Sequence, residues 1–246
     1  MEDHKRIIKF GGISGVVGIT IFIGITVILE QFYWQKIPAK TTGEVLRVLG
    51  SSSHSQITMG GHFLIGFTAI LFIVAFLALM KLLESEKPAS FARIGGLFGV
   101  IACPIMVIQM LVQGTVMVRM GRLFIAATDE AQRQSIAILY RGLRNFDIGI
   151  DLAFDSFFFS AWILLGFAML KSKYFGKILG ALGIVLFGIT AVLNLWTAPN
   201  PPSFEMSPVV SVWVLAVYIQ MLRVAKSAQV WGELRIPANL FIHQFF

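Results

Sequence analysis

Three aspartates that recur at every fourth position, Asp147, Asp151 and Asp155, are the residues best spaced to do chemistry. This spacing places them on adjacent turns of one helical face. Between Asp155 and the next charge, Lys171, lie 15 uncharged residues, 156–170. Because a helix needs about 20 apolar residues to cross a bilayer, the span must include part of the acidic segment. We expect Asp155 about one turn inside the outer surface, Asp151 at that surface and Asp147 in water. Ionisable groups within a membrane are costly and mark functional sites.

Other polar residues of the predicted spans fall at the same level. They are Glu30, His62, Gln109, Gln113, Arg119 and Asn194. Together with the aspartates they predict a polar cluster that faces outward, whereas the inner half of the bundle has almost no comparable residue. Two interpretations stay open. The cluster binds a small ligand or ion, or it is a structural network in which Arg119 or Arg144 neutralises Asp151 or Asp155 and the amides join helices.

The sequence gives little support for other chemistries. His54 and His62 are eight residues apart, and with nearby carboxylates they do not form a recognised metal-ligand spacing, so a metal stays unassigned. No HExxH motif occurs, and Ser156 and Ser160 have no histidine at a diagnostic spacing. The pattern therefore leans against an enzyme and identifies no cofactor.

Composition places the chain in a membrane. Hydrophobic residues make up 57% of it and charged residues 13%, against roughly 25% charged in soluble domains. The net charge of +7 comes from Lys and Arg that flank apolar runs, which membrane topology explains better than nucleic acid does. We predict an all-α, single-domain bundle over 1–246 with six transmembrane spans, at about 8–30, 57–80, 92–118, 146–170, 175–197 and 207–224.

The distribution of basic residues predicts the orientation. With the N-terminus inside, the short inner segments hold 12 Lys and Arg and the outer segments hold 8. This favours cytoplasmic N- and C-termini in a multi-pass protein of the plasma membrane. Each of the two long outer loops is expected to contain a short amphipathic helix, over 41–50 and 128–144.

Small residues in the spans occur at the spacing used for helix packing. The pairs are Gly11 with Gly15, Gly95 with Gly99, and Gly176 with Gly180. Such pairs let helix backbones approach closely, and we expect them to pack helices of the same chain rather than to form a dimer.

The second half of the chain resembles an uncharacterised family of prokaryotic six-helix membrane proteins, catalogued as a domain of unknown function. The matching motifs lie within 146–215: Asp151-Leu-Ala-Phe-Asp155, the run 175–183, the run 194–202, and Pro208 with Trp213. The resemblance implies a helical bundle in the plasma membrane and includes Asp151, Asp155 and Asn194 in the family pattern. It implies no activity.

The sequence thus predicts a membrane protein without a catalytic motif. The first expectation is an accessory or scaffold subunit of a membrane complex, or a small sensor-like binder with an outward-facing polar cluster. The alternative is an ion-coupled carrier of a small solute that uses Asp155 and Asp151. An intramembrane enzyme or metal-binding protein ranks third. The expected partners are the lipid bilayer, other membrane subunits and a small ligand or ion on the outer side, and not nucleic acid.

Overall fold

Helices account for the fold in the computed structural model, which describes residues 2–32, 41–86, 89–197 and 207–227. The α-helices are α1 (Glu2–Phe32), α2 (Thr42–Gly50), α3 (Ser52–Glu84), α4 (Ala89–Leu111), α5 (Val118–Ala126), α6 (Glu130–Leu170), α7 (Gly176–Thr197) and α8 (Ser207–Lys226). A π-helical segment, η2 (Val112–Met117), joins α4 to α5. No strand occurs among the described residues.

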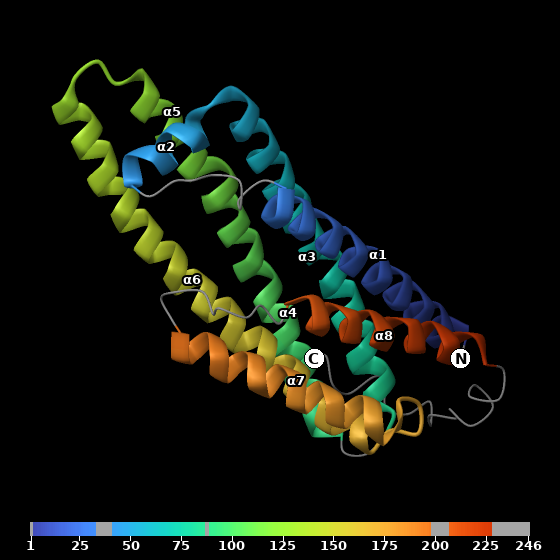
Figure 1. Ribbon diagram of the computed structural model, residues 1–246. Helices are drawn as coiled ribbons and strands as arrows, with labels where there is room; N and C mark the ends of the chain where they lie inside the picture. The colour runs from blue at the N-terminus through green and yellow to red at the C-terminus, as the bar shows by residue number, and fades with distance from the viewer. Residues whose placement is uncertain (1, 33–40, 87–88, 198–206, 228–246) are drawn as a thin grey trace, which may run out of the picture.

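Six helical stretches are long and apolar enough to cross a membrane, so the predicted all-α, six-span fold is confirmed. They are Glu2–Thr26, Ser52–Glu84, Ala89–Ala126, Glu130–Leu170, Gly176–Asn194 and Pro208–Lys226. Helices α2 and α5 and the first half of α6 form one end of the bundle, which we call the cap end (Figure 1). The start of α1 and the end of α8 lie at the opposite end, which we call the terminal end (Figure 1).

Of the two helices expected in the long loops, one is present as a separate helix and the other is not. The first is present as α2, whose N-cap Thr41 accepts from the Glu44 backbone N–H and donates its own N–H to the Glu44 carboxylate. This reciprocal capping box was readable in the sequence. The second, over 128–144, is not a separate helix. It continues without a break into the fourth span as the 41-residue α6, because no proline or C-cap interrupts the pattern.

Glycines set the distances at which helices pack, as their spacing predicted. Gly11 packs on Ala78 of α3, and Gly15 packs on the ring of Tyr218 in α8. At the cap end, Gly50 of α2 meets the backbone of Gly121 in α5, so these two short helices lie in direct contact. Gly95, Gly99 and Gly180 also face neighbouring helices, whereas Gly176 has a φ of 74° and begins α7.

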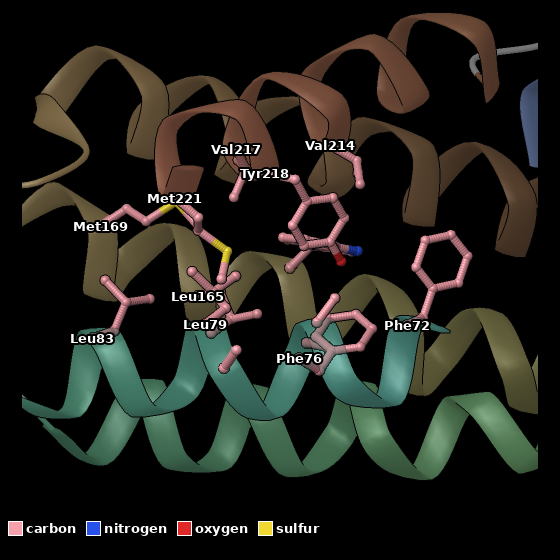
Figure 2. Close-up of a cluster of buried hydrophobic side chains, with 14 of the residues drawn as sticks. Phe72, Phe76, Leu79, Leu83, Leu165, Met169, Val214, Val217, Tyr218 and Met221 are labelled. Atoms are coloured by element: carbon pink, nitrogen blue, oxygen red, sulfur yellow. The ribbon is translucent and has the colours of Figure 1, made fainter. Parts of the chain in front are cut away.

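The terminal half of the bundle is densely packed. Figure 2 shows side chains of α3, α6 and α8 facing one another across this core. None of the following is more than 2% exposed: Phe76, Leu79, Leu83, Leu165, Met169, Val217, Tyr218 and Met221. Apolar side chains therefore fill this part of the described structure.

Candidate functional site

Each aspartate of α6 accepts a hydrogen bond from a side-chain amide on another helix. The Gln113 amide nitrogen lies 3.1 Å from both carboxylate oxygens of Asp147. One turn along, Gln109 Nε2 donates to Asp151 Oδ1 at 2.7 Å. Asp155 Oδ2 accepts from Asn194 Nδ2 of α7, also at 2.7 Å. We call these three pairs the amide ladder. The first two pairs form side by side because the two glutamines and the two aspartates are each four residues apart. The helices that carry them are antiparallel and packed together.

Asp147 is the most buried of the three acids, which corrects the prediction that it would be in water. Its side chain is 1% exposed, and Arg144 Nη1 donates to its Oδ2 at 2.5 Å. The prediction assumed that the helices end at the membrane surface. In fact α3, η2 and α6 all continue toward the cap end and enclose Asp147.

The other two acids also differ from the predicted order. Asp151 is exposed and Asp155 is partly buried. The charge of Asp147 is therefore compensated by a salt bridge, whereas Asp151 and Asp155 accept hydrogen bonds from amides. Amides stabilise a carboxylate by donating hydrogen bonds but leave its negative charge in place.

His62 extends the rung at Asp147 to α3. Its Nδ1 lies 2.7 Å from the Thr58 carbonyl oxygen, which can only accept, and its Nε2 lies 3.0 Å from Gln113 Oε1. Because the Gln113 amide nitrogen already donates to Asp147, its oxygen is the acceptor for His62. Both ring nitrogens therefore face an acceptor oxygen, although a neutral imidazole can donate from only one of them. His62 is 7% exposed, so it belongs with Arg144 to the network around the buried Asp147.

The π-helical segment lies at the centre of this network. Gln113 is its second residue, and it bridges α3 and α6 through His62 and Asp147. Single π-turns inside α-helices are frequent at functional sites. The sequence did not predict this segment, since no residue of 112–117 distinguishes a π-turn from an α-turn.

Two predicted members do not join the network in the described part of the chain. Arg119 is exposed and forms no ion pair with a described carboxylate. Arg144, the other base expected to neutralise Asp151 or Asp155, pairs with Asp147 instead. The side chain of Glu30 lies outside the described residues. Of the predicted residues, the structure brings together His62 with Gln113 and Asp147, Gln109 with Asp151, and Asn194 with Asp155.

A pocket of about 150 Å³ opens between α6 and α7 beside Asp155. Its lining comprises Leu152, Asp155, Ser156, Phe159, Ser160, Ile163, Ala191 and Asn194. The two helices are in contact where Gly166 and Gly180 meet backbone to backbone. Figure 1 shows α7 diverging from α6 away from their connection, and the pocket lies on that side of the glycine contact.

The sequence analysis did not predict that Ser156 and Ser160 line a pocket together with Asp155. Ser156 and Ser160 were considered only as nucleophiles, although they share one helical face with Asp155, Phe159 and the other α6 lining residues. That shared face is the signal that could have identified them. No group of three His, Cys, Asp or Glu side chains that could hold a metal occurs among the described residues.

The comparisons with known proteins place the chain in a family. Residues 13–225 match a domain of unknown function, DUF4386. The chain belongs to the DUF4386 family. The match extends well beyond the stretch 146–215 in which the sequence resembled such a family, and it includes all six candidate spans at least in part. No curated protein and no solved structure matches the chain.

Proposed function

We propose that this DUF4386 protein is a membrane-embedded binding protein that takes a small positively charged ligand into the pocket between α6 and α7. One observation carries the proposal. The carboxylate of Asp155 lines a pocket whose eight described lining residues include no base, and it accepts a hydrogen bond from the neutral amide of Asn194. A partly buried carboxylate in apolar surroundings favours a cationic partner, because an unpaired charge there is costly.

The charges around the pocket support a cation rather than an anion. Arg144 compensates Asp147, so the net negative charge of the α6 ladder rests on Asp151 and Asp155. Asp151 is exposed one turn nearer the cap end. An exposed acid outside a partly buried one raises the local concentration of cations and guides them inward.

The packing of the terminal half favours a binder over a carrier. A carrier needs an aqueous path past the pocket, and the next turns of α6 toward the terminal end present Trp162 and Leu165, each 0% exposed. Trp162 packs against Phe76, with ring centroids 5.1 Å apart, and against Tyr218 at 5.9 Å. A large rearrangement would have to open this core, so we rank the ion-coupled carrier second.

Thermal unfolding of the purified protein in chlorides of Na⁺, K⁺, ammonium and methylammonium tests the proposal. A ligand that binds the folded state raises its unfolding temperature. We expect at least one cation to stabilise the wild type and the Glu130→Gln variant, which removes an exposed acid of α6 far from the pocket. Asp155→Asn keeps the shape of the side chain but removes its charge, and we expect it to abolish the response.

Two results would contradict the proposal. Equal responses of the wild type and Asp155→Asn to every cation would exclude Asp155 as the counter-ion. Native mass spectrometry of the wild type could instead show a stoichiometric partner protein. If both variants keep this partner and respond to cations as the wild type does, the accessory-subunit role is favoured.

A further inference from the structure

We infer that the ligand of the α6–α7 pocket is a primary ammonium ion with a short hydrocarbon chain, an inference that rests on the proposed function. The pocket combines two kinds of lining that such a molecule matches. Asp155, Ser156, Ser160 and Asn194 supply polar atoms. The remaining lining residues are the apolar Leu152, Phe159, Ile163 and Ala191.

The hydrogen bonds of the polar residues leave mainly acceptors free. Ser156 donates its hydroxyl proton to the Leu152 carbonyl oxygen at 2.7 Å, so its oxygen can only accept from a ligand. Asp155 is an acceptor at both oxygens when ionised, and Oδ2 takes one bond from Asn194. A carboxylate has about four lone-pair sites, so most of them stay available. A primary ammonium group has three N–H donors and no acceptor, which suits this set.

The apolar lining argues against a bare metal ion. An alkali or divalent cation prefers a shell of oxygen ligands, and here four of the eight lining residues are hydrocarbon. Those residues can cover an alkyl chain and remove it from water, which favours binding in proportion to the apolar area buried.

The size of the pocket limits the length of the chain. A cavity of about 150 Å³ holds a molecule the size of benzene, with roughly six heavy atoms. An ammonium group with a chain of about four or five carbons therefore fills the pocket. A quaternary ammonium ion has no N–H donor and leaves the acceptors of Asp155 and Ser156 unmatched.

A series of straight-chain amines tests the inference on the wild-type protein. The probes are methyl-, ethyl-, n-butyl- and n-octylammonium chloride, with tetramethylammonium chloride, NaCl and 1-butanol as comparisons. Dissociation constants come from the ligand dependence of thermal unfolding. Affinity should rise about four-fold for each added methylene up to butyl, as expected for burial of about 0.8 kcal/mol per group. The gain per methylene should then fall for octyl, whose chain exceeds the pocket.

The variants separate the head of the ligand from its tail. Ala191→Leu reduces the space for the alkyl chain, so we expect n-butylammonium to lose at least ten-fold in affinity while methylammonium changes little. Ser156→Ala removes an acceptor and should weaken every amine in the series alike. 1-Butanol, with the same chain but no charge, reports the contribution of partition into the detergent, and its effect should be the same in the wild type and Asp155→Asn.

The failures of the inference and of the proposed function are distinguishable. If Na⁺ or tetramethylammonium stabilises the wild type as well as n-butylammonium does, and through Asp155, the ligand class is wrong while the cation site stands. An affinity that does not depend on chain length would likewise show that the ligand class is wrong while the cation site stands. If no cation in the series acts through Asp155, both the ligand class and the proposed function fail.

Discussion

Replacement of Gln113 by leucine tests the pair of the amide ladder whose acid, Asp147, is buried. The side chain of Gln113 makes one bond to His62 and donates to both oxygens of Asp147. Hydrogen bonds to charged groups contribute about 1.5–3 kcal/mol in soluble proteins, whereas those between membrane helices average about 0.6 and reach about 1.7. Bonds to the buried carboxylate of Asp147 and to the buried ring of His62 give an expected loss of about 2–3 kcal/mol for Gln113→Leu.

Gln109→Leu is the matched control, because it changes the same residue type one turn away. Gln109 bonds to Asp151, which is exposed and can take water in place of the amide. We expect a loss of about 0.5–1 kcal/mol, near the average for membrane helices. Reversible unfolding of both variants in mixed detergent and dodecyl sulfate would measure the difference.

A double-mutant cycle of Gln113→Leu with Asp147→Asn would attribute the loss to the pair. Removal of the Asp147 charge should reduce the cost of Gln113→Leu by about 1 kcal/mol, above the 0.3–0.5 kcal/mol within which independent sites add. Equal costs for Gln109→Leu and Gln113→Leu, together with additive values in the cycle, would refute the view that burial of Asp147 gives the rung its strength.

Three further predictions concern other contacts. Gly180→Ala places a Cβ within 2.8 Å of backbone atoms of α6 and should destabilise the protein by about 1–3 kcal/mol, measured by thermal unfolding. Trp213→Phe loses the indole hydrogen bond of 3.0 Å to the Leu179 carbonyl and part of a buried side chain, so a loss of roughly 2 kcal/mol is expected in the same assay. The predicted orientation places residue 130 outside the cell, so a membrane-impermeant maleimide should label Glu130→Cys in intact cells. The wild type should stay unlabelled, because its single cysteine, Cys103, is 3% exposed. If Glu130→Cys is labelled only after the cells are lysed, the orientation is the reverse of the predicted one.

Hydropathy and charge were sufficient to predict the spans, because the bilayer imposes a length and a polarity that any spanning helix must satisfy. The capping box at Thr41 and Glu44 likewise predicted α2 from local chemistry. The continuity of α6 was not predicted. A run of acids followed by bases marks a helix and its direction, but it does not mark where the helix ends.

The members of the candidate site were largely predictable and their pairing was not. Gln109, Gln113 and Asn194 were expected near the aspartates from depth alone. Which amide meets which acid depends on the register of α4 and η2 against α6, and this is fixed by packing over the whole contact. The equal spacing of Gln109 with Gln113 and of Asp147 with Asp151 was the available signal. The burial of Asp147 depends on helices that extend beyond the spans, which a count of apolar residues does not detect.

The order of the amide ladder along the chain bears on how the protein enters the membrane during synthesis. An aspartate at the centre of an inserting helix costs about 2.5–3.5 kcal/mol. Asp155, expected about one turn inside the outer surface, adds part of that cost to the insertion of α6 by itself. Gln109 and Gln113 are made before α6, so their amides are in place when Asp147 and Asp151 arrive. Asn194 lies on α7, which is made after α6, so the hydrogen bond to Asp155 can form only after α7 has been synthesised. A chain that stops after α6 should therefore insert that helix less efficiently than one that continues through α7.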